Sequence, residues 1–373
     1  MKQISIMIKP ASALCNLRCR YCFYADVAEK REVPSYGIMT EETTERLLTN
    51  VRDWLSPGDT VSFAFQGGEP TLAGLPYFQR FAELVKQWDS VRVQFAFQTN
   101  GILLDEDWCT FFRENKVLVG VSWDLLPDCH DAARVDADGN GTNKTVQNAV
   151  RLLEKNGVEY NILCTLTNFI ARHPEQVWKQ LVRNDIRYVQ FTPCLGALDA
   201  SADDPYALTP RRFASFYDRL FSLWYEDFRN GSYRSVKYFD DLVNLMAFGR
   251  PNMCGIDGKC RPQLVTEADG SVYPCDFYCM DDYCLGNLAH QPLAELLASP
   301  KIGEFACREH TMPTLCTGCP YAKLCGGGCK RMQKEIACFR NDSFCGIQTF
   351  LRAHGEQLRS IAAEERRLRK DAE

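Results

Sequence analysis

The sequence predicts an α/β protein, in which a partial barrel of six strand–helix units precedes a cysteine-rich segment. Two observations predict this fold class. In residues 1–200, short runs of β-branched and aromatic residues alternate with amphipathic stretches, a pattern typical of parallel βα units. From Pro251 onward, the chain is rich in Cys, Gly and Pro and shows little periodicity. Such a segment is not expected to build a conventional core, so bound metal is expected to hold it together.

The hydrophobic pattern of each unit predicts its strand and its helix. The expected strands are Ile4–Ile8, Val61–Phe65, Val91–Phe97, Val117–Ser122, Tyr160–Leu166 and Tyr188–Thr192. The helices expected between them are Glu41–Leu55 with Thr40 as its N-cap, Tyr77–Gln87, Glu106–Asn115, Thr145–Asn156 and Glu175–Arg183. Six units are fewer than the eight of a complete barrel, so the barrel is expected to be partial.

The rest of the chain divides by composition. Residues 1–200 are expected to form the βα core, and the acidic, turn-rich stretch Ala197–Pro205 follows as a linker. Residues 201–250 are expected to be a helical linker region with helices at Pro210–Arg229 and Val236–Phe248. Residues 251–348 form the cysteine-rich segment, and 349–373 a charged C-terminal helix that we expect to be solvated.

Composition excludes several classes of protein. With 43 Lys and Arg against 48 Asp and Glu among 373 residues, the net charge is −5, which argues against nucleic acid as the main partner. There is no apolar run long enough to span a membrane and no signal-peptide pattern at the start, so we expect a cytoplasmic protein without a membrane partner. Its 19 cysteines therefore indicate bound metal more than disulfides.

Three cysteines near the N-terminus are spaced C-x3-C-x2-C, at Cys15, Cys19 and Cys22. Three thiolates bind three irons of a [4Fe–4S] cluster and leave the fourth iron open to a substrate or cofactor. A zinc site is the alternative, but zinc prefers a fourth ligand close by, and the nearest histidine is His130.

This loop, with Tyr21 before its third cysteine, resembles the signature of radical S-adenosylmethionine (SAM) enzymes. The resemblance implies that SAM binds the open iron and is cleaved by one electron to a 5′-deoxyadenosyl radical. Gly68 lies in Gln66-Gly-Gly-Glu-Pro70, which resembles the family's GGE motif, whose backbone and carboxylate receive the SAM amino group. Further positions match family residues that contact SAM, namely Ser122, Arg134 and Leu195.

The C-terminal cysteines resemble a SPASM domain, so the resemblance covers a partial (βα)6 radical SAM barrel followed by a SPASM domain with two auxiliary clusters. It implies one auxiliary [4Fe–4S] cluster on Cys254, Cys260, Cys275 and Cys329. It implies a second on Cys316, Cys319, Cys325 and Cys345, and thus three clusters in all. Zinc ribbons are the alternative for these cysteines. The eight remaining cysteines are expected to be small buried apolar residues.

Several segments resemble anaerobic sulfatase-maturating enzymes, among them Asp269-Gly-Ser-Val-Tyr-Pro-Cys275-Asp276-Phe-Tyr and Trp224-Tyr-Glu-Asp-Phe228. These enzymes oxidise a Cys or Ser of an unfolded sulfatase polypeptide to Cα-formylglycine. The resemblance implies that Asp276 is the general base and that an external flavodoxin- or ferredoxin-type protein donates electrons. A turn carboxylate is the alternative reading of Asp276.

One residue departs from the family pattern. Leu125 replaces a glycine that commonly follows the fourth strand, and a left-handed backbone there would be strained by leucine. Two other functions stay open. One is a SPASM enzyme that forms a crosslink or another modification in a ribosomal peptide, and the other is an electron-carrying or zinc-binding scaffold.

Overall fold

The computed structural model describes residues 1–198, 204–307, 312–339 and 341–372. The chain divides into two compact units, each assembled from separate stretches of sequence. The first comprises Met1–Trp123, His130–Asn161 and Pro262–Ala306, and the second comprises Asp124–Cys129, Ile162–Arg261 and Cys307–Glu373. Part of the expected linker Ala197–Pro205, residues 199–203, lies outside the described residues.

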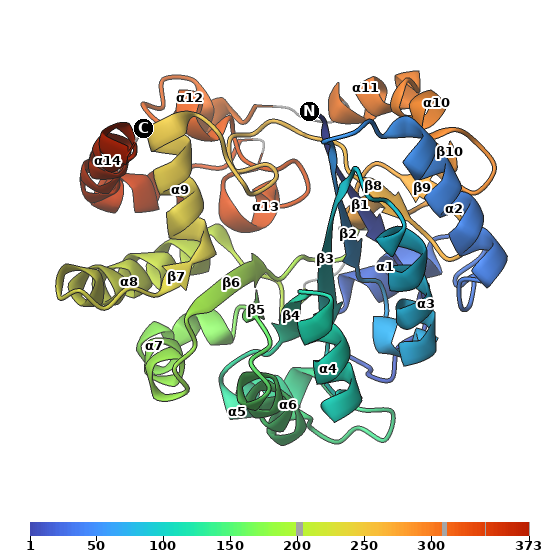
Figure 1. Ribbon diagram of the computed structural model, residues 1–373. Coiled ribbons are helices and arrows are strands. Elements are labelled where there is room, and N and C mark those ends of the chain that lie inside the picture. The colour runs from blue at the N-terminus through green and yellow to red at the C-terminus, as the bar shows by residue number, and fades with distance from the viewer. Residues whose placement is uncertain (199–203, 308–311, 340, 373) are drawn as a thin grey trace. The chain divides into compact units, whose positions relative to one another are not determined.

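Parallel strands form the centre of the first unit. Strands β1 (Gln3–Ile8), β2 (Thr60–Phe65), β3 (Arg92–Thr99) and β4 (Leu118–Ser122) pair parallel in that order. Figure 1 shows helices α2 (Glu41–Trp54), α3 (Leu75–Lys86) and α4 (Glu106–Glu114) along one face of these strands, and α6 (Asn143–Lys155) follows in sequence. Thr40 caps α2, because its side-chain oxygen accepts a hydrogen bond from the Thr43 amide. These elements confirm the predicted units to within a few residues.

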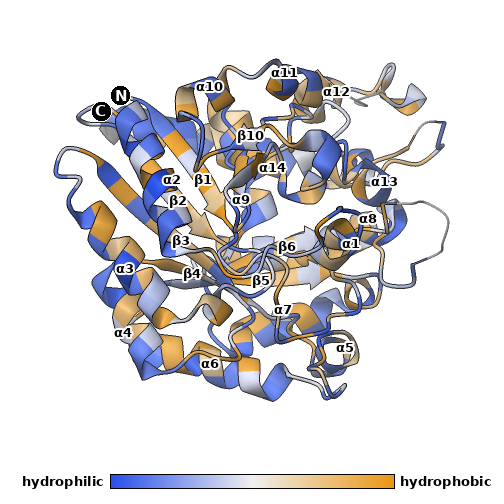
Figure 2. Ribbon diagram, turned by 90° about the vertical axis from the view of Figure 1, so that its right-hand side faces the viewer, coloured by the Kyte–Doolittle hydropathy of each residue, from blue (hydrophilic) through white to orange (hydrophobic). Residues whose placement is uncertain are grey.

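Aromatic side chains fill the space between strands and helices in this unit. Phe63 and Phe65 of β2 point at Phe81 of α3, with ring centroids 5.1 Å apart in both pairs. Hydrophobic and hydrophilic stretches alternate along α2, α3 and α4 in Figure 2, as expected for helices with one buried face. The space between β2 and α3 is therefore filled by aromatic side chains.

Part of the cysteine-rich segment extends this sheet. Strand β8 (Leu264–Thr266) pairs parallel with β1, and β9 (Ser271–Tyr273) and β10 (Gly286–Asn287) add antiparallel, giving the order β10-β9-β8-β1-β2-β3-β4. Val265, Val272 and Tyr273 are buried. The expectation that this segment builds no conventional core is thus wrong for its first part. Its strands are two or three residues long, too short to show periodicity.

The second unit contains most of β5 (Tyr160–Leu166), from Ile162 onward, together with β6 (Tyr188–Pro193) and β7 (Ser235–Val236). These strands pair parallel in that order. Its helices are α7 (Pro174–Arg183), α8 (Pro210–Arg229), α9 (Lys237–Phe248), α12 (Ala322–Cys325), α13 (Gln333–Ile336) and α14 (Gly346–Ala372). The chain also forms α1 (Phe23–Glu29), α5 (Pro127–Ala133), α10 (Leu293–Leu297) and α11 (Pro300–Cys307).

The C-terminal helix is not the solvated helix that its charges indicate. Helix α14 packs against α8 and α9, and Phe350, Leu351 and Leu358 are buried. Only the stretch after Ala362 is exposed throughout. The prediction of a solvated helix is wrong because the charged residues cluster in the last turns, whereas the first four turns carry an apolar face.

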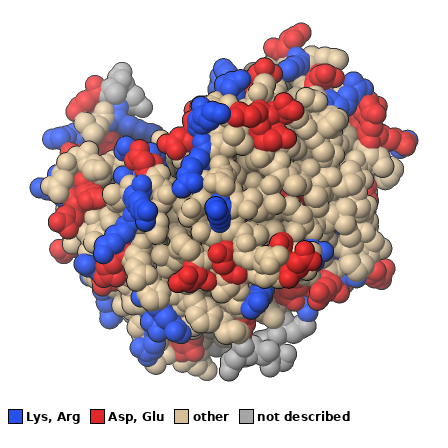
Figure 3. Space-filling view, turned by 90° about the horizontal axis from the view of Figure 1, so that it is seen from below, with Lys and Arg blue, Asp and Glu red and all other residues tan. Residues whose placement is uncertain are grey.

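Surface charge is mixed on the face drawn in Figure 3, where Lys and Arg side chains intermingle with Asp and Glu. Within the described part of the chain, no helix combines the length and apolar character needed to cross a bilayer.

Candidate functional site

The three N-terminal cysteines occupy the loop between β1 and α1. Cys22 is the N-cap residue of α1, and its amide donates to the Cys19 carbonyl oxygen at 3.2 Å. Cys22 is exposed, while Cys15 and Cys19 are half-buried. Burial raises the pKa of the Cys15 thiol to about 12. This thiol is therefore neutral at pH 7 unless a metal ion stabilises its thiolate.

The glycine motif after β2 supports the cysteine loop directly. The Gly68 amide donates to the Ser12 carbonyl at 2.8 Å, and the Glu69 amide donates to the Leu14 carbonyl at 2.8 Å. A Cβ atom added to Gly68 would lie only 2.0 Å from the Leu14 carbonyl oxygen. Only glycine permits this close approach. Gly68 therefore sets the distance between its own loop and the backbone that carries Cys15.

The Glu69 carboxylate accepts hydrogen bonds from residues that follow β2 and from residues at the end of β3. One oxygen accepts from the Thr71 amide, the Thr71 hydroxyl and the Thr99 hydroxyl, and the other accepts from the Asn100 amide at 2.7 Å. Burial raises the pKa of Glu69, although these hydrogen bonds oppose the shift. The contacts join the end of β2 to the end of β3 and hold the Glu69 carboxylate in a fixed position.

Two expected cofactor contacts gather at Cys19. The Arg134 guanidinium lies 5.4 Å from the centre of the Tyr21 ring, and its Nη1 lies 3.8 Å from the Cys19 sulfur. Ser122 ends β4 in the same unit, where its hydroxyl accepts from the Gln98 side-chain amide at 2.9 Å. Leu195 follows β6 in the second unit and is buried.

Asp276 forms an ion pair with a residue that the sequence analysis missed. The Lys9 ammonium lies 2.6 Å from Oδ1 of Asp276, and the two side chains are 1% and 17% exposed. The ammonium also lies 3.3 Å from the centre of the Tyr24 ring, a cation–π contact. Burial alone lowers the pKa of Lys9, but the charge of Asp276, with smaller effects of neighbouring groups, places it well above its usual value. The lysine is therefore a fixed cation.

A buried network surrounds this pair. The Tyr24 hydroxyl donates to Glu267, whose carboxylate also accepts from the Ser12 hydroxyl at 2.8 Å and pairs with Arg31 at 2.8 Å. The Glu267 side chain is completely buried. Each charge in the network has a partner, as burial requires. The network links the cysteine loop to the β8–β9 turn and fixes the ring on which Lys9 lies.

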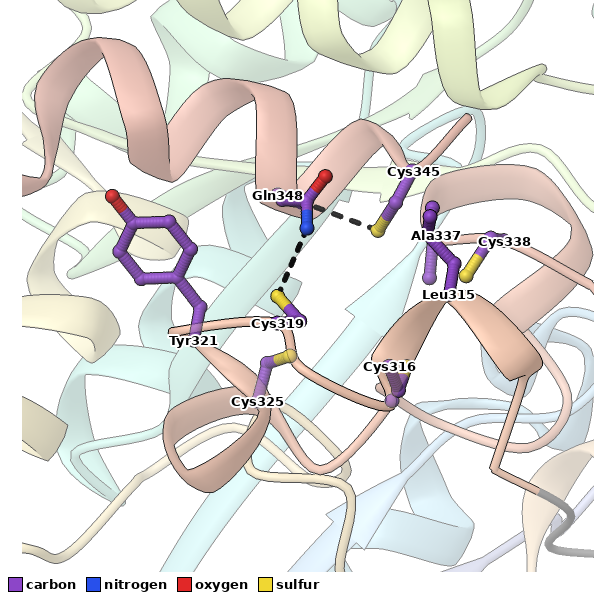
Figure 4. A pocket seen from close by; sticks show the side chains of 10 residues that line it. Leu315, Cys316, Cys319, Tyr321, Cys325, Ala337, Cys338, Cys345 and Gln348 are labelled. Carbon is purple, nitrogen blue, oxygen red and sulfur yellow. Dashed lines mark hydrogen bonds between the residues drawn. The ribbon is translucent and has the colours of Figure 1, made fainter. Parts of the chain in front are cut away.

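In the second unit, five cysteines line one pocket. Figure 4 shows Cys316, Cys319, Cys325 and Cys345 around this space, together with Cys338. Burial raises the pKa of Cys325 to about 11 and also raises the pKa of Cys345. Among the described residues, no three Cys, His, Asp or Glu side chains converge closely enough for one metal ion. An iron–sulfur cluster is normally held by four thiolates, and the four cysteines expected to hold the second auxiliary cluster all line this pocket.

Three of the four cysteines expected for the other auxiliary cluster are neighbours in the second unit. Cys254 and Cys329 both contribute to raising the pKa of Cys260, after burial. Gly255 lies so close to Cys329 that an added Cβ would be 2.6 Å from the Cys329 Cβ. Cys275, the fourth expected ligand, lies in the first unit, where it precedes the short 3-10 helix Asp276–Tyr278.

Leu125 has the left-handed backbone that its place in the sequence predicts. Its φ is +63°, and its side chain is completely buried. Leucine in this conformation costs about 1–2 kcal/mol. Burial of the side chain offsets this strain, which explains how the chain tolerates leucine here.

The cysteines without an expected metal are mostly buried, as predicted. Cys109, Cys164, Cys194, Cys279 and Cys338 are buried, whereas Cys129 and Cys284 are half-buried. The prediction is wrong for Cys307, which is exposed at the end of α11.

The missed residues had only weak signals in the sequence. Lys9 directly follows the first strand, and polar residues at the carboxyl ends of parallel strands commonly face a site. Glu267 follows β8, a strand too short to recognise. Gln348 lies three residues after Cys345, within the contact range of one helical turn.

Comparison with known proteins places these features in context. Residues 10–182 match the radical SAM superfamily, and residues 259–320 match the iron-sulfur cluster-binding SPASM domain. A cysteine-type anaerobic sulfatase-maturating enzyme of Clostridium perfringens is 41% identical over 92% of this chain and 94% of its own. A serine-type enzyme of Bacteroides thetaiotaomicron is 28% identical over 88% of this chain and 83% of its own. A solved structure described as native anSMEcpe with bound AdoMet and Cp18Cys peptide has a TM-score of 0.88 and 38% identity, covering 97% of this chain and 99% of that one.

Proposed function

Because the chain belongs to the anaerobic sulfatase-maturating enzymes, which are radical SAM proteins with a SPASM domain, we propose that it oxidises a cysteine of a sulfatase polypeptide to Cα-formylglycine. One observation carries the choice of cysteine over serine. Identity is 41% to a cysteine-type relative and 28% to a serine-type relative at nearly equal coverage of this chain. A solved structure of similar fold contains bound AdoMet and a peptide, which supports a polypeptide as substrate.

The cofactors proposed are SAM and three [4Fe–4S] clusters. We assign the SAM-binding cluster to Cys15, Cys19 and Cys22, and the auxiliary clusters to the two sets of four cysteines in residues 251–348. When bound, the first cluster and SAM supply a deoxyadenosyl radical that removes a Cβ hydrogen from the substrate. The residues 1–200 then form the catalytic core, 201–250 a helical connection, and 349–373 a terminal helix.

The SAM contacts proposed are Tyr21, Gly68, Ser122, Arg134 and Leu195. Arg134 supports this role because its guanidinium lies beside the Cys19 sulfur and the Tyr21 ring, where a carboxylate ligand would be neutralised. Gly68 supports it because the loop backbone approaches the cysteine loop without a side chain between them.

Asp276 is the proposed general base, which takes the thiol proton of the substrate cysteine. The Cβ–SH group would become a thioaldehyde by loss of three species: the hydrogen atom to the deoxyadenosyl radical, the proton to Asp276, and one electron, which the auxiliary clusters would accept when bound. Water then replaces the sulfur with oxygen and releases hydrogen sulfide. The Lys9 ammonium supports this role because it lies 2.6 Å from the Asp276 carboxylate and holds that group in a defined position.

The remaining partner is an electron donor, for which we propose a flavodoxin- or ferredoxin-type protein. We also propose a cytoplasmic location, because cysteines that bind iron–sulfur clusters must stay reduced and the cytosol keeps thiols reduced.

Mass spectrometry of a peptide substrate tests the proposal. Anaerobically reconstituted protein, SAM and dithionite are incubated with a Cys-x-Pro-x-Arg peptide and, in parallel, with the matching Ser peptide. We expect conversion of the cysteine side chain to an aldehyde, with faster turnover than for serine. Loss of two hydrogens with retention of sulfur would instead support the crosslinking alternative, and an unchanged peptide with intact SAM would support a scaffold.

A further inference from the structure

Gln348 lines the pocket formed by Cys316, Cys319, Cys325 and Cys345, although it is not one of the expected cluster ligands. Gln348 lies in the first turn of α14, three residues after Cys345. Its side-chain Nε2 donates to the Cys319 sulfur at 3.1 Å, and its backbone amide donates to the Cys345 sulfur at 3.4 Å (Figure 4). One residue therefore donates to two of the four sulfurs.

Two features of α14 keep Gln348 in position to make these contacts. The backbone amides in the first turn of a helix have no carbonyl partner within the helix, so the Gln348 amide is available to a sulfur. Helix α14 is anchored by Phe350 and Leu351, which are completely buried beside Gln348. The side chain of Gln348 is half-buried, so water competes only partly for its amide.

Donors to sulfur change the electron affinity of an iron–sulfur cluster. Reduction adds one negative charge, and hydrogen bonds to the thiolates stabilise the more negative form, which raises the reduction potential. A hydrogen bond to an ionised acceptor is also stronger than one between neutral groups. The cavity around Gln348 is otherwise lined by cysteines and by Leu315, Tyr321, Gly327 and Ala337.

We propose that Gln348 tunes the cluster held by Cys316, Cys319, Cys325 and Cys345, because its side-chain and backbone amides donate to two of the thiolates and raise the reduction potential of the cluster. This inference rests on the proposed cluster assignment. It does not depend on the identity of the substrate.

Cys338 is a fifth sulfur in the same cavity and provides an internal check. It makes side-chain hydrogen bonds with Cys316 and Cys345 and is completely buried. A cubane cluster needs four thiolates, so Cys338 is a neighbour of the cluster in this assignment. Cys338→Ala is therefore expected to keep the full iron content.

The test is a potentiometric titration of the anaerobic holoprotein followed by electron paramagnetic resonance. The background carries alanine at Cys15, Cys19 and Cys22, so that only the auxiliary clusters contribute, and dithionite supplies the electrons. Gln348→Leu removes the side-chain donor. Gln357→Leu is the matched control, because the same substitution on the same helix lies outside the cavity.

We expect Gln348→Leu to keep about eight irons per chain and to shift the potential of one auxiliary cluster to a more negative value. The other cluster and the Gln357→Leu protein should be unchanged. Should Gln348→Leu fail to retain its iron, Gln348→Lys decides, since a cationic donor should shift the same potential upward. Unchanged potentials in both Gln348 variants would overturn the inference. Wild-type protein with full iron but no peptide oxidation would overturn only the proposed function.

Discussion

The Lys9 ammonium and the Asp276 carboxylate lie 2.6 Å apart, with the lysine 1% exposed and the aspartate 17% exposed. The pair joins the end of the first strand to the residue after Cys275. Gly67 packs against the lysine stem, since a Cβ added there would lie 3.0 Å from the Lys9 Cβ. The Lys9 side chain therefore has little conformational freedom. Its buried ammonium fixes the position of the Asp276 carboxylate.

Lys9→Met is expected to lower formylglycine production by about 100-fold, because a misplaced base loses alignment with the thiol proton. Cleavage of SAM and iron content should be retained, since Lys9 does not touch the cysteine loop ligands. Asp276→Asn should lower production by about the same factor or more. The double variant should lose little beyond Asp276→Asn, because Lys9 acts through Asp276. Fully additive losses in this cycle would contradict the assignment.

The Lys9–Asp276 ion pair should stabilise the folded protein up to high pH, because the pKa of Lys9 is raised. The folded-state pKa of Lys9 lies well above its unfolded value, so the stabilisation is fully present below about pH 10 and is lost as pH rises through the folded value. Lys9→Met leaves a carboxylate without its buried partner and should cost on the order of 3 kcal/mol. Thermal unfolding of holoprotein at pH 7 and pH 9 should show the same difference from wild type at both values. A difference that disappears by pH 9 would contradict the raised pKa.

Gly68→Ala is expected to abolish the N-terminal cluster, because the added methyl group collides with the Leu14 carbonyl and displaces the loop that carries Cys15. Iron should fall from about twelve to about eight atoms per chain, while the auxiliary clusters remain. Gly303→Ala is the control, since it lies in α11 with nothing within 4 Å of an added Cβ. Equal iron in both variants would show that the close approach at Gly68 is not needed.

Substitutions at Leu125 separate strain from packing. Glycine relieves about 1–2 kcal/mol of backbone strain but loses a buried leucine, which is worth about 3–5 kcal/mol. Packing is the larger effect, so Leu125→Gly should destabilise the protein by about 2 kcal/mol. Alanine keeps the strain and loses most of the packing, so Leu125→Ala should be less stable than Leu125→Gly. Thermal unfolding gives the order, and a glycine variant more stable than wild type would contradict this balance.

The sequence predicted the βα units well because their strands and helices are long enough to show a period. Strand β5 and helix α8, for example, have the expected bounds Tyr160–Leu166 and Pro210–Arg229. The strands β8, β9 and β10 escaped prediction because two or three residues show no alternation. The charged residues at the C-terminal end of α14 predict a solvated helix. The apolar face that packs on α8 and α9 lies on its first four turns, away from those charges.

The candidate site shows the same division. The cysteines and the Gly-Gly-Glu segment carry spacing that can be read along the chain. Lys9 and Asp276 are 267 positions apart in the sequence, and only the parallel pairing of β1 with β8 brings their segments together. The partners of Glu267 and the contact of Gln348 with Cys319 are also tertiary contacts, which no local pattern reports.

Tracing the abstracted hydrogen is the most direct test of the proposed reaction. The substrate is a Cys-x-Pro-x-Arg peptide with deuterium on the cysteine Cβ, incubated with reconstituted protein, SAM and dithionite. We expect deuterium in the 5′-deoxyadenosine and an aldehyde on the same peptide that a hydrazide reagent captures. Deoxyadenosine without deuterium, beside a peptide that keeps its thiol, would contradict the assignment of this chain as a cysteine-oxidising enzyme.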